Sequence, residues 1–445
     1  MSTTPTRRAV LATGLTAGAS AVLGGCAMGG TGGGPARDLG DEEEGKGAKL
    51  KGKITVWSWD VAAKAMKRLA GDFEKRHPGT AVEIVDIGYD NAYDKITVGL
   101  RGGTGLADVL TVEGSYLPNY IGNFPDGFYD LTDLGGRHGG DFDRAAWKTV
   151  TDPGGKVYAL PWDIGPCALY YRTDHFRAAG VDPKSLVTWD DYVKAGIRIR
   201  KATGRKLLIL DSTDTGILPL LLQQQGQSYF KGGRVAVDTP EAVEALSLMK
   251  RLRDEGLVAY EKGWDGLVTG TKEGKVSTTP TAAWWSGTLT AEMPELKGKF
   301  GVVPLPGFTA DGTRTSNLGG STLCIPAQSK NPRLAWAFLE FLLTGKANQV
   351  SMLKREGLFP AYLPALDDPY LSGKQEYFGG QRTLDVFARL ARSIPPVEYN
   401  KDDAKATDIM TSAVTGVMLR GKDPKEALGS AAEQLARATG RKRTG

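Results

Sequence analysis

Hydrophobic residues in the first part of the chain alternate between the spacing of a strand and the spacing of a helix. Lys53–Trp57 is a short apolar run that predicts a buried strand, and Ala62, Met66, Leu69 and Phe73 then recur at helical spacing. The same alternation continues with a strand over 81–87, a helix over 93–100 and a strand over 107–112. Strands that alternate with helices predict βαβ units and a largely parallel sheet.

The pattern restarts after a glycine-proline kink at Gly165-Pro166. Strand-like segments over 156–161 and 168–171 flank this kink. Thr188 and Thr239 follow as predicted helix caps, and Lys206–Leu210 is a predicted strand. Two α/β units joined by extended crossings predict two lobes around a cleft, which is where proteins of this class bind ligands.

Strand and helix patterns complete the chain without an internal repeat. Two strand-like runs, 300–304 and 321–326, precede an amphipathic helix that opens at Asn331-Pro332. The final third is predicted to be helical, with apolar faces around Val417 and Leu435. The predicted fold class is therefore α/β, with two lobes.

The first 50 residues have the composition of an export signal and a tether. Arg7-Arg8 precede a weakly apolar run that ends at Cys26, which is typical of a Tat-like bacterial signal over 1–25. Leu23-Gly24-Gly25-Cys26 resembles a lipobox, in which Cys26 would carry the lipid. The alternative is a plain cleaved signal with an incidental cysteine. The Gly-rich and acidic stretch over 26–50 is predicted to be a flexible tether, so we expect an exported chain held at the outer face of the cell membrane.

Charge and cysteine content exclude some classes of protein. The whole chain carries +5, which becomes +3 without Arg7 and Arg8, and no basic stripe is interleaved with aromatic residues, so we expect no nucleic-acid partner. Roughly 395 residues remain after the tether, enough for two packed lobes. Cys167 and Cys324 could form a disulfide in an oxidising exterior or remain two buried thiols, and the sequence leaves both open.

Several motifs resemble those of the family 1 extracellular solute-binding proteins, the maltose-binding-protein-like sugar receptors. The resemblance covers about Lys51 to Thr439 and depends on the order and spacing of the motifs. They are Ile54-Thr55-Val56-Trp57-Ser58-Trp59, Ala107-Asp108-Val109-Leu110, 155–163, Gly319-Gly320-Ser321-Thr322 and 325–332. Weaker likenesses at 357–361 and 377–381 are similar to lactose- and arabinoside-type receptors.

This resemblance implies a type II periplasmic-binding-protein-like fold that closes on a sugar and presents it to an ABC permease. It places one lobe at 51–162 plus 303–346 and the other at 163–302 plus 347–445. We expect a monomer that needs no cofactor and delivers a sugar, of two or more units, to the permease. Closure would occur by rotation about the crossings near Gly165 and Gly320.

Aromatic side chains beside carboxylates are the residue types that a sugar requires. Rings stack on the apolar C–H face of a sugar, and carboxylates accept hydrogen bonds from its hydroxyls. Trp59-Asp60 follows a strand end and Trp162-Asp163 lies at the first crossing, so both pairs are predicted ligand contacts. A packing tryptophan beside a turn aspartate remains the alternative for the second pair. Trp57 is the better core candidate near the first pair.

Other predicted ligand contacts are distributed along the whole body of the chain. Glu113 and Tyr116 end the strand at 107–112, and one ring of Trp284-Trp285 is predicted to face the ligand if that segment is extended. Gly319 and Gly320 would allow the backbone to approach the ligand, although a turn explains them equally well. The remaining candidates are Asp211, Trp264, Tyr362 and Tyr399.

Competing functions lack their required motifs. A secreted glycoside hydrolase needs two carboxylates with assigned roles, and no motif assigns them. His77, His138 and His175 have no partner at metal-ligand spacing, so we expect neither a metal site nor catalysis. An anionic solute such as a polyol phosphate would require arginines at the contact segments, which instead contain Trp, Asp, Glu and Tyr.

Overall fold

The computed structural model describes residues 49–444. The predicted export signal, the predicted lipid acceptor Cys26 and nearly all of the predicted tether lie outside the described residues. Within 49–444, no helix combines the length and the apolar character that spanning a bilayer requires.

A five-stranded sheet with the order β2-β1-β3-β12-β4 forms the first half of the architecture. Its strands are β1 (Gly52–Ser58), β2 (Thr80–Asp86), β3 (Val109–Glu113), β4 (Ala159–Pro161) and β12 (Ser321–Cys324). β1 pairs in parallel with β2 and β3, whereas β12 is antiparallel to β3 and β4. The expectation of a largely parallel sheet is therefore right for the βαβ units. It is wrong for β12, which comes much later in the chain and pairs antiparallel with both of its neighbours.

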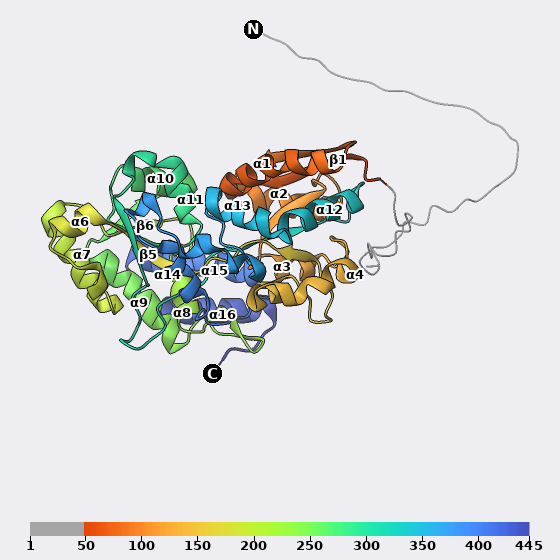
Figure 1. Cartoon of the computed structure of the whole chain (residues 1–445). Helices are drawn as coiled ribbons and strands as arrows, with labels where there is room; N and C mark the ends of the chain where they lie inside the picture. The colour runs from red at the N-terminus through yellow and green to blue at the C-terminus, as the bar shows by residue number, and fades with distance from the viewer. Residues whose placement is uncertain (1–48, 445) are drawn as a thin grey trace, which may run out of the picture. The chain divides into compact units, whose positions relative to one another are not determined.

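Helices cover this first sheet because each has one apolar face. α1 (Asp60–Arg76) buries Met66, Leu69 and Phe73 against the same core as Ile54 and Val56 of β1. α2 (Tyr89–Gly102) and α12 (Pro332–Leu343) accompany α1 and β1 in one group of elements (Figure 1). The predicted strand–helix alternation is thus present from β1 to β3.

A second sheet follows the kink at Gly165-Pro166. β5 (Cys167–Arg172) lies between β10 (Thr278–Ala282) and β11 (Phe300–Val303), and both pairs are antiparallel. β6 (Leu208–Asp211) and β9 (Val258–Glu261) are parallel, and a single bridge between Lys206 and Val276 connects them to β10. A short hairpin of β7 (Phe230–Lys231) and β8 (Arg234–Val235) lies apart from both sheets.

Two helices beside the second sheet begin where the sequence predicts. α7 (Trp189–Thr203) opens with a capping box in which Thr188 and Asp191 satisfy each other's backbone N–H groups. α9 (Pro240–Asp254) begins with the Thr239 hydroxyl accepting from the Ala242 N–H and with proline in the first turn. The other helices of the chain are α3 (Leu117–Asn123), α4 (Thr132–Gly135), α5 (Arg144–Thr149), α6 (Thr173–Ala178), α8 (Leu218–Gln224), α10 (Gly263–Lys272), α11 (Trp285–Glu292), α13 (Lys346–Glu356), α14 (Thr383–Ala391), α15 (Asp403–Arg420) and α16 (Pro424–Thr439).

Three extended segments cross side by side between the two sheets. The first, 163–166, pairs with 317–321 through Leu318 N–H to Gly165 O at 2.9 Å. It also pairs with 359–361 through Ile164 N–H to Phe359 O at 2.9 Å. The expected lobe boundary at residue 303 falls inside β11, where Val303 pairs with Leu169, so the chain returns to the first sheet only at 317–321.

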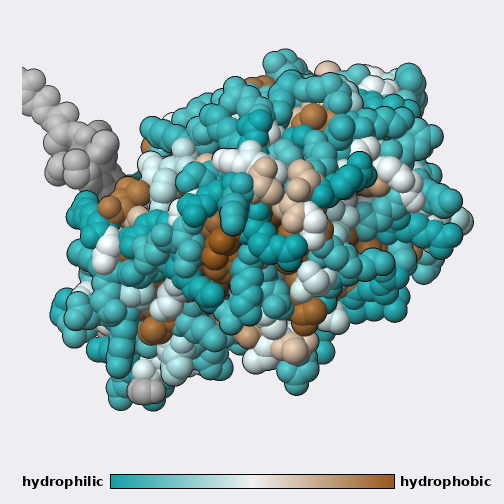
Figure 2. All heavy atoms as spheres, turned by 90° about the vertical axis from the view of Figure 1, so that its left-hand side faces the viewer, coloured by the Kyte–Doolittle hydropathy of each residue, from teal (hydrophilic) through white to brown (hydrophobic). Residues whose placement is uncertain are grey.

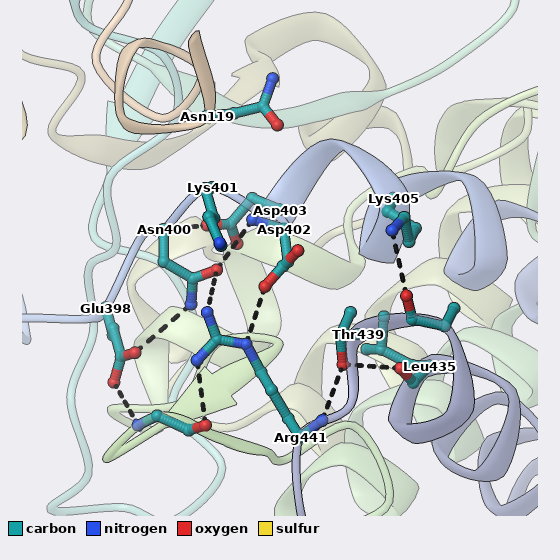
Figure 3. Close-up of polar contacts among 12 residues, drawn as sticks. Asn119, Glu398, Asn400, Lys401, Asp402, Asp403, Lys405, Leu435, Thr439 and Arg441 are labelled. Atoms are coloured by element: carbon teal, nitrogen blue, oxygen red, sulfur yellow. Dashed lines mark hydrogen bonds and ion pairs between the residues drawn. The ribbon is translucent and has the colours of Figure 1, made fainter. Parts of the chain in front are cut away.

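The C-terminal end of the chain anchors a loop that precedes α15. Arg441 donates from Nε to Asp402 Oδ2 at 2.8 Å and from Nη1 to Gly233 O at 3.1 Å (Figure 3). The backbone of this loop in turn contacts α3, because Asn123 Nδ2 donates to Lys401 O at 2.7 Å. The 398–403 loop is therefore held by Arg441 on one side and by Asn123 of α3 on the other.

One face of the molecule is predominantly hydrophilic, with hydrophobic residues in small separate patches (Figure 2).

The sequence left open whether the two cysteines of the folded body form a disulfide. Cys167 in β5 and Cys324 in β12 are free and fully buried. Of the two possibilities that the sequence allowed, two buried thiols is the one observed.

Candidate functional site

A cavity of about 320 Å³ lies where the crossing segments meet both sheets. Its wall contains residues at or just after the ends of β1 and β3 on one side. On the other side it contains residues of β6, β9 and β10 and of the segments that follow these strands. Of the residues predicted as ligand contacts, those on the cavity wall are Trp59, Asp60, Glu113, Asp163, Asp211, Trp264, Trp284, Gly319 and Gly320.

Trp59 and Asp60 stand at the junction of β1 and α1. Trp59 is the N-cap residue of α1, and its ring lies 5.6 Å from the Tyr89 ring and 6.1 Å from the Tyr93 ring, centroid to centroid. Asp60 has φ +44°, the one positive value among the non-glycine residues of the described chain. Strained backbone of this kind concentrates at binding sites, where the surrounding structure holds it in place. Burial, together with Asp86 nearby, raises the pKa of Asp60 to about 6.

Glu113 ends β3 and is held by two tyrosines of α2. Its Oε2 accepts a hydrogen bond from Tyr93 at 2.7 Å and from Tyr89 at 3.2 Å. Burial raises the pKa of Glu113, and the two tyrosine hydroxyls act in the opposite direction. Because one carboxylate oxygen is fixed by these bonds, the other is oriented towards Gly319, where a Cβ would lie 3.3 Å from Oε1.

Asp163 lines the cavity from the first crossing segment. Its Oδ1 accepts from the Ser321 N–H at 2.7 Å, so the side chain links two crossing segments. The residue is 4 % exposed, and burial raises its pKa to about 7. The group therefore titrates near neutral pH while it lines the cavity.

Gly319 and Gly320 need glycine for two separate reasons. Both have positive φ, +72° and +92°, which other residues adopt only with strain. A Cβ on Gly320 would also lie 3.0 Å from the Asp163 carbonyl oxygen. The turn that the sequence allowed is therefore present, and the approach of this backbone to a ligand stays a prediction.

Three tryptophans form a packed group at the opposite wall. Trp264 opens α10 and lies 5.7 Å from Trp284, whose Nε1 donates to the Leu318 carbonyl at 3.0 Å. The Trp284-Trp285 segment is not extended: Trp285 is the first residue of α11. Trp285 is fully buried with its ring at 88° to that of Trp264, so only Trp284 of the pair reaches the cavity.

Asp211 connects the end of β6 to the start of α10. Its Oδ2 accepts from the Gly263 N–H at 2.6 Å, and its Oδ1 accepts from the Thr213 N–H at 2.7 Å. A carboxylate at a helix N-terminus is favoured by the helix dipole. Asp211 thus positions Trp264, the next residue of that helix.

Five of the predicted contacts lie away from the cavity wall. Trp162 and Trp285 are fully buried in the core that also contains Ile54 and Phe338. For Trp162 this happens because side chains alternate along an extended segment, and Asp163 takes the cavity side. The remaining three are Tyr116, which stacks on Tyr93 at 3.9 Å, Tyr362, which packs on Phe142 at 5.4 Å, and Tyr399, which lies on the 398–403 loop.

Sequence reasoning missed other wall residues that come from the same strand and helix ends. Tyr89 lies four residues before Tyr93, a spacing that could have indicated a shared helix face. Asp214 follows β6 in the turn that begins at Asp211. The missed residues include Tyr89, Asp90, Asp214, Glu261, Thr281 and Thr288.

This arrangement is suited to a polar ligand with apolar faces. Trp59, Trp264 and Trp284 provide ring surfaces, and the carboxylates provide hydrogen-bond acceptors with fixed positions. No group of three or more His, Cys, Asp or Glu residues with metal-binding geometry occurs within 49–444.

Comparisons with known proteins give a consistent result. The profile of the bacterial extracellular solute-binding proteins matches residues 57–349. The arabinooligosaccharide-binding protein of Bacillus subtilis (strain 168) is 27 % identical over 410 residues, which cover 88 % of this chain and 94 % of that protein. The lactose-binding protein of Rhizobium radiobacter is 28 % identical over 402 residues, or 87 % of this chain and 93 % of that protein.

Solved structures agree in fold. The ABC transporter associated binding protein of B. animalis subsp. lactis Bl-04, in complex with β-1,6-galactobiose, superimposes with a TM-score of 0.79 at 25 % identity. The alignment covers 89 % of this chain and all of that one. The GacH receptor of Streptomyces glaucescens GLA.O gives a TM-score of 0.77 at 22 % identity, covering 88 % and 100 % of the two chains.

Proposed function

The chain belongs to the bacterial extracellular solute-binding proteins, and we propose that its cavity is the site at which it captures a saccharide of two or more units for an ABC transporter. The proteins that it resembles over nearly its whole body include an arabinooligosaccharide-binding protein, a lactose-binding protein and an ABC transporter associated binding protein in complex with a disaccharide. Its two-lobed α/β fold is that of sugar-binding proteins.

One observation carries the assignment of the site. Tryptophans from both sheets, Trp59 on one side and Trp264 with Trp284 on the other, line one cavity together with hydrogen-bond acceptors. A saccharide held between such walls contacts both lobes at once, so its binding favours the closed arrangement. The division into lobes at the three crossing segments is part of this proposal.

The residues of the cavity wall also bear on the alternative ligand, a phosphorylated solute. No lysine, arginine or histidine is among the described residues of the wall, which disfavours a phosphorylated ligand. We propose that the protein releases its ligand unchanged, in keeping with a family of binding proteins. Incubation of the purified protein with its saccharide, followed by chromatography, should return the saccharide intact.

Thermal unfolding against a panel of neutral di- and oligosaccharides tests the function. A ligand that binds only the folded state raises the unfolding midpoint as its concentration increases above Kd. We expect a concentration-dependent rise with at least one saccharide, and a much smaller rise for Trp264→Ala. A panel that leaves the midpoint unchanged throughout would contradict the proposal.

Attachment to the cell surface forms a separate part of the proposal. Cys26 and the signal before it match a lipobox, and the family is extracellular. We propose that lipid on Cys26 holds a monomer near its permease. Cys26→Ala should move the protein from the membrane fraction to the medium, and retention in the membrane would contradict this step.

A further inference from the structure

The cavity wall is rich in carboxyl groups, and burial raises the pKa values of Asp60 and Asp214 to about 6, so both are largely ionised at neutral pH. Seven carboxylates line the cavity, and no cationic side chain is among the described wall residues. The seven are Asp60, Asp90, Glu113, Asp163, Asp211, Asp214 and Glu261. A neutral saccharide requires hydrogen-bond acceptors, but carbonyls, amides and hydroxyls would supply them without the electrostatic cost of gathering so many anions.

Almost none of this charge is neutralised by the protein. Glu261 is paired with Lys275 at 2.7 Å, and the other six carboxylates form no ion pair within the described part of the chain. Lys64 lies near Asp60 but is itself paired with Glu292 at 3.0 Å. A positive charge in the cavity would therefore find carboxylates that are not paired with another cation.

The carboxylates face each other from the two sides of the cavity. Asp60 and Asp90 follow β1 and β2, and Glu113 ends β3, whereas Asp211 ends β6 and Asp214 follows it. Asp90 Oδ2 approaches the backbone of Gly263 so closely that a Cβ there would lie 2.8 Å away. Bringing these walls together brings like charges closer, which is electrostatically unfavourable. A cation bound between the walls makes the same approach favourable.

Two further features of the wall suit a cation-bearing polar ligand. The faces of Trp59, Trp264 and Trp284 attract ammonium groups through their ring quadrupoles. Thr288 lines the same cavity, is 2 % exposed, and its hydroxyl has no hydrogen-bond partner in the protein. A polar ligand group that reached this hydroxyl would supply the hydrogen bond that the protein does not.

From these observations, and on the basis of the carbohydrate-binding function proposed above, we infer that the preferred ligand is a cationic amino-saccharide. Its protonated amine would lie among Asp60, Asp90 and Asp214, and its sugar rings would stack on the tryptophans. Acidic saccharides such as uronic-acid oligomers would be excluded by the same wall. A cationic amino-saccharide is a narrower class of ligand than the saccharides proposed above.

Linkage-matched sets of three saccharides provide the test, with calorimetry as the measurement. Each set contains a neutral disaccharide, its 2-amino analogue and the N-acetylated form of that analogue. The sets are taken in the β-1,4 and α-1,4 gluco series and the β-1,6 galacto series. In the linkage that binds, we expect the free amine to bind about tenfold tighter or more than both partners. The advantage should shrink at high salt, because charge pairing is screened.

Variants separate the charge effect from general damage to the site. Asp90→Asn and Asp214→Asn each remove one exposed carboxylate from the wall and should lower the ratio of amine affinity to neutral-saccharide affinity, whatever their effect on the neutral saccharide itself. Asp311→Asn, an exposed aspartate outside the wall, is the matched control and should change nothing.

The outcomes distinguish the inference from the function on which it depends. If neutral saccharides bind as tightly as their amines, the inference is wrong and the carbohydrate-binding function stands. If no saccharide of any charge binds, both are wrong.

Discussion

Trp264 and Trp147 have the same ring in different surroundings. Substituting each in turn distinguishes a role in ligand binding from a role in packing. Trp264 lines the cavity beside Trp284, whereas Trp147 packs against Phe142 at 5.9 Å, away from the cavity. Both are partly exposed, so neither ring is essential to the deep core.

We predict that Trp264→Ala weakens saccharide affinity by about 1–3 kcal/mol, because the apolar contact with the sugar face is lost. Calorimetry provides the measurement. Trp147→Ala is the control and should leave the affinity unchanged. Equal affinities of Trp264→Ala and the unmodified protein would remove Trp264 from the site.

Asp163 predicts a pH dependence of stability. Its pKa is about 7 in the folded chain, above the ordinary 3.8, so the folded state keeps a proton that the unfolded state has lost between pH 4 and pH 7. The free energy of unfolding should therefore fall as pH rises through this window and level off above it. Asp403, with a pKa raised to about 7, contributes with the same sign.

Asp163→Asn should make this decline shallower, because an amide keeps the acceptor for the Ser321 N–H without a charge. One pKa unit corresponds to about 1.4 kcal/mol, so the change should amount to a few kcal/mol across the window. Denaturant titrations at several pH values provide the measurement. An unchanged slope would show that Asp163 titrates normally.

The two aromatic–carboxylate pairs show how far residue types can be interpreted from sequence. Trp59-Asp60 and Trp162-Asp163 have the same composition, yet both members of the first pair line the cavity and only the aspartate of the second does. The first pair sits where a strand becomes a helix, so the backbone turns and both side chains can face one side. The second lies on an extended segment, where neighbours point in opposite directions.

At the scale of elements, the crossing segments depend on close backbone contact. A Cβ on Gly165 would lie 1.9 Å from the Leu318 carbonyl oxygen, a position that no side chain can share. Gly429 in α16 has no atom within 4 Å of the equivalent position.

Gly165→Ala and Gly429→Ala should therefore have opposite effects on stability. We expect the first to lower the free energy of unfolding by about 1–3 kcal/mol or more through forced separation of the segments. The second should raise it by about 0.5–1 kcal/mol because alanine favours the helix. Urea unfolding measures both, and a neutral Gly165→Ala would indicate that the crossings tolerate separation.

The anchoring of the 398–403 loop makes a further prediction. Arg441→Ala removes the bonds to Asp402 and Gly233 and should lower the free energy of unfolding by about 1–3 kcal/mol. Hydrogen exchange at 400–403 should become faster. Arg437→Ala, which changes an exposed arginine of α16, is the control and should affect neither quantity.

Element positions were largely predictable from the sequence, and their pairings were not. The caps at Thr188 and Thr239 and the strand-helix alternation are local patterns, so they identified α7, α9 and the βαβ units. The antiparallel return of β12 and the helical state of Trp285 depend on contacts between distant segments. Local patterns contain no information about such contacts.

At the scale of the whole molecule, both sheets contribute to one cavity. A ligand that contacts both walls should shift the protein towards a closed arrangement by rotation at the crossing segments. We predict a smaller radius of gyration in the presence of a bound saccharide, measured by small-angle X-ray scattering. The Trp264→Ala variant at the same saccharide concentration should retain the larger radius, and an unchanged radius on saturation would argue against closure.

The packed group of Trp264, Trp284 and Trp285 has an optical consequence. Their ring centroids lie 5.5 to 6.2 Å apart at mutual angles of 47° to 88°, close enough for the indole transitions to couple. A saccharide placed against two of these three rings changes their electronic environment directly. Near-ultraviolet circular dichroism should therefore act as a built-in sensor, so that the protein reports its own occupancy without an attached label.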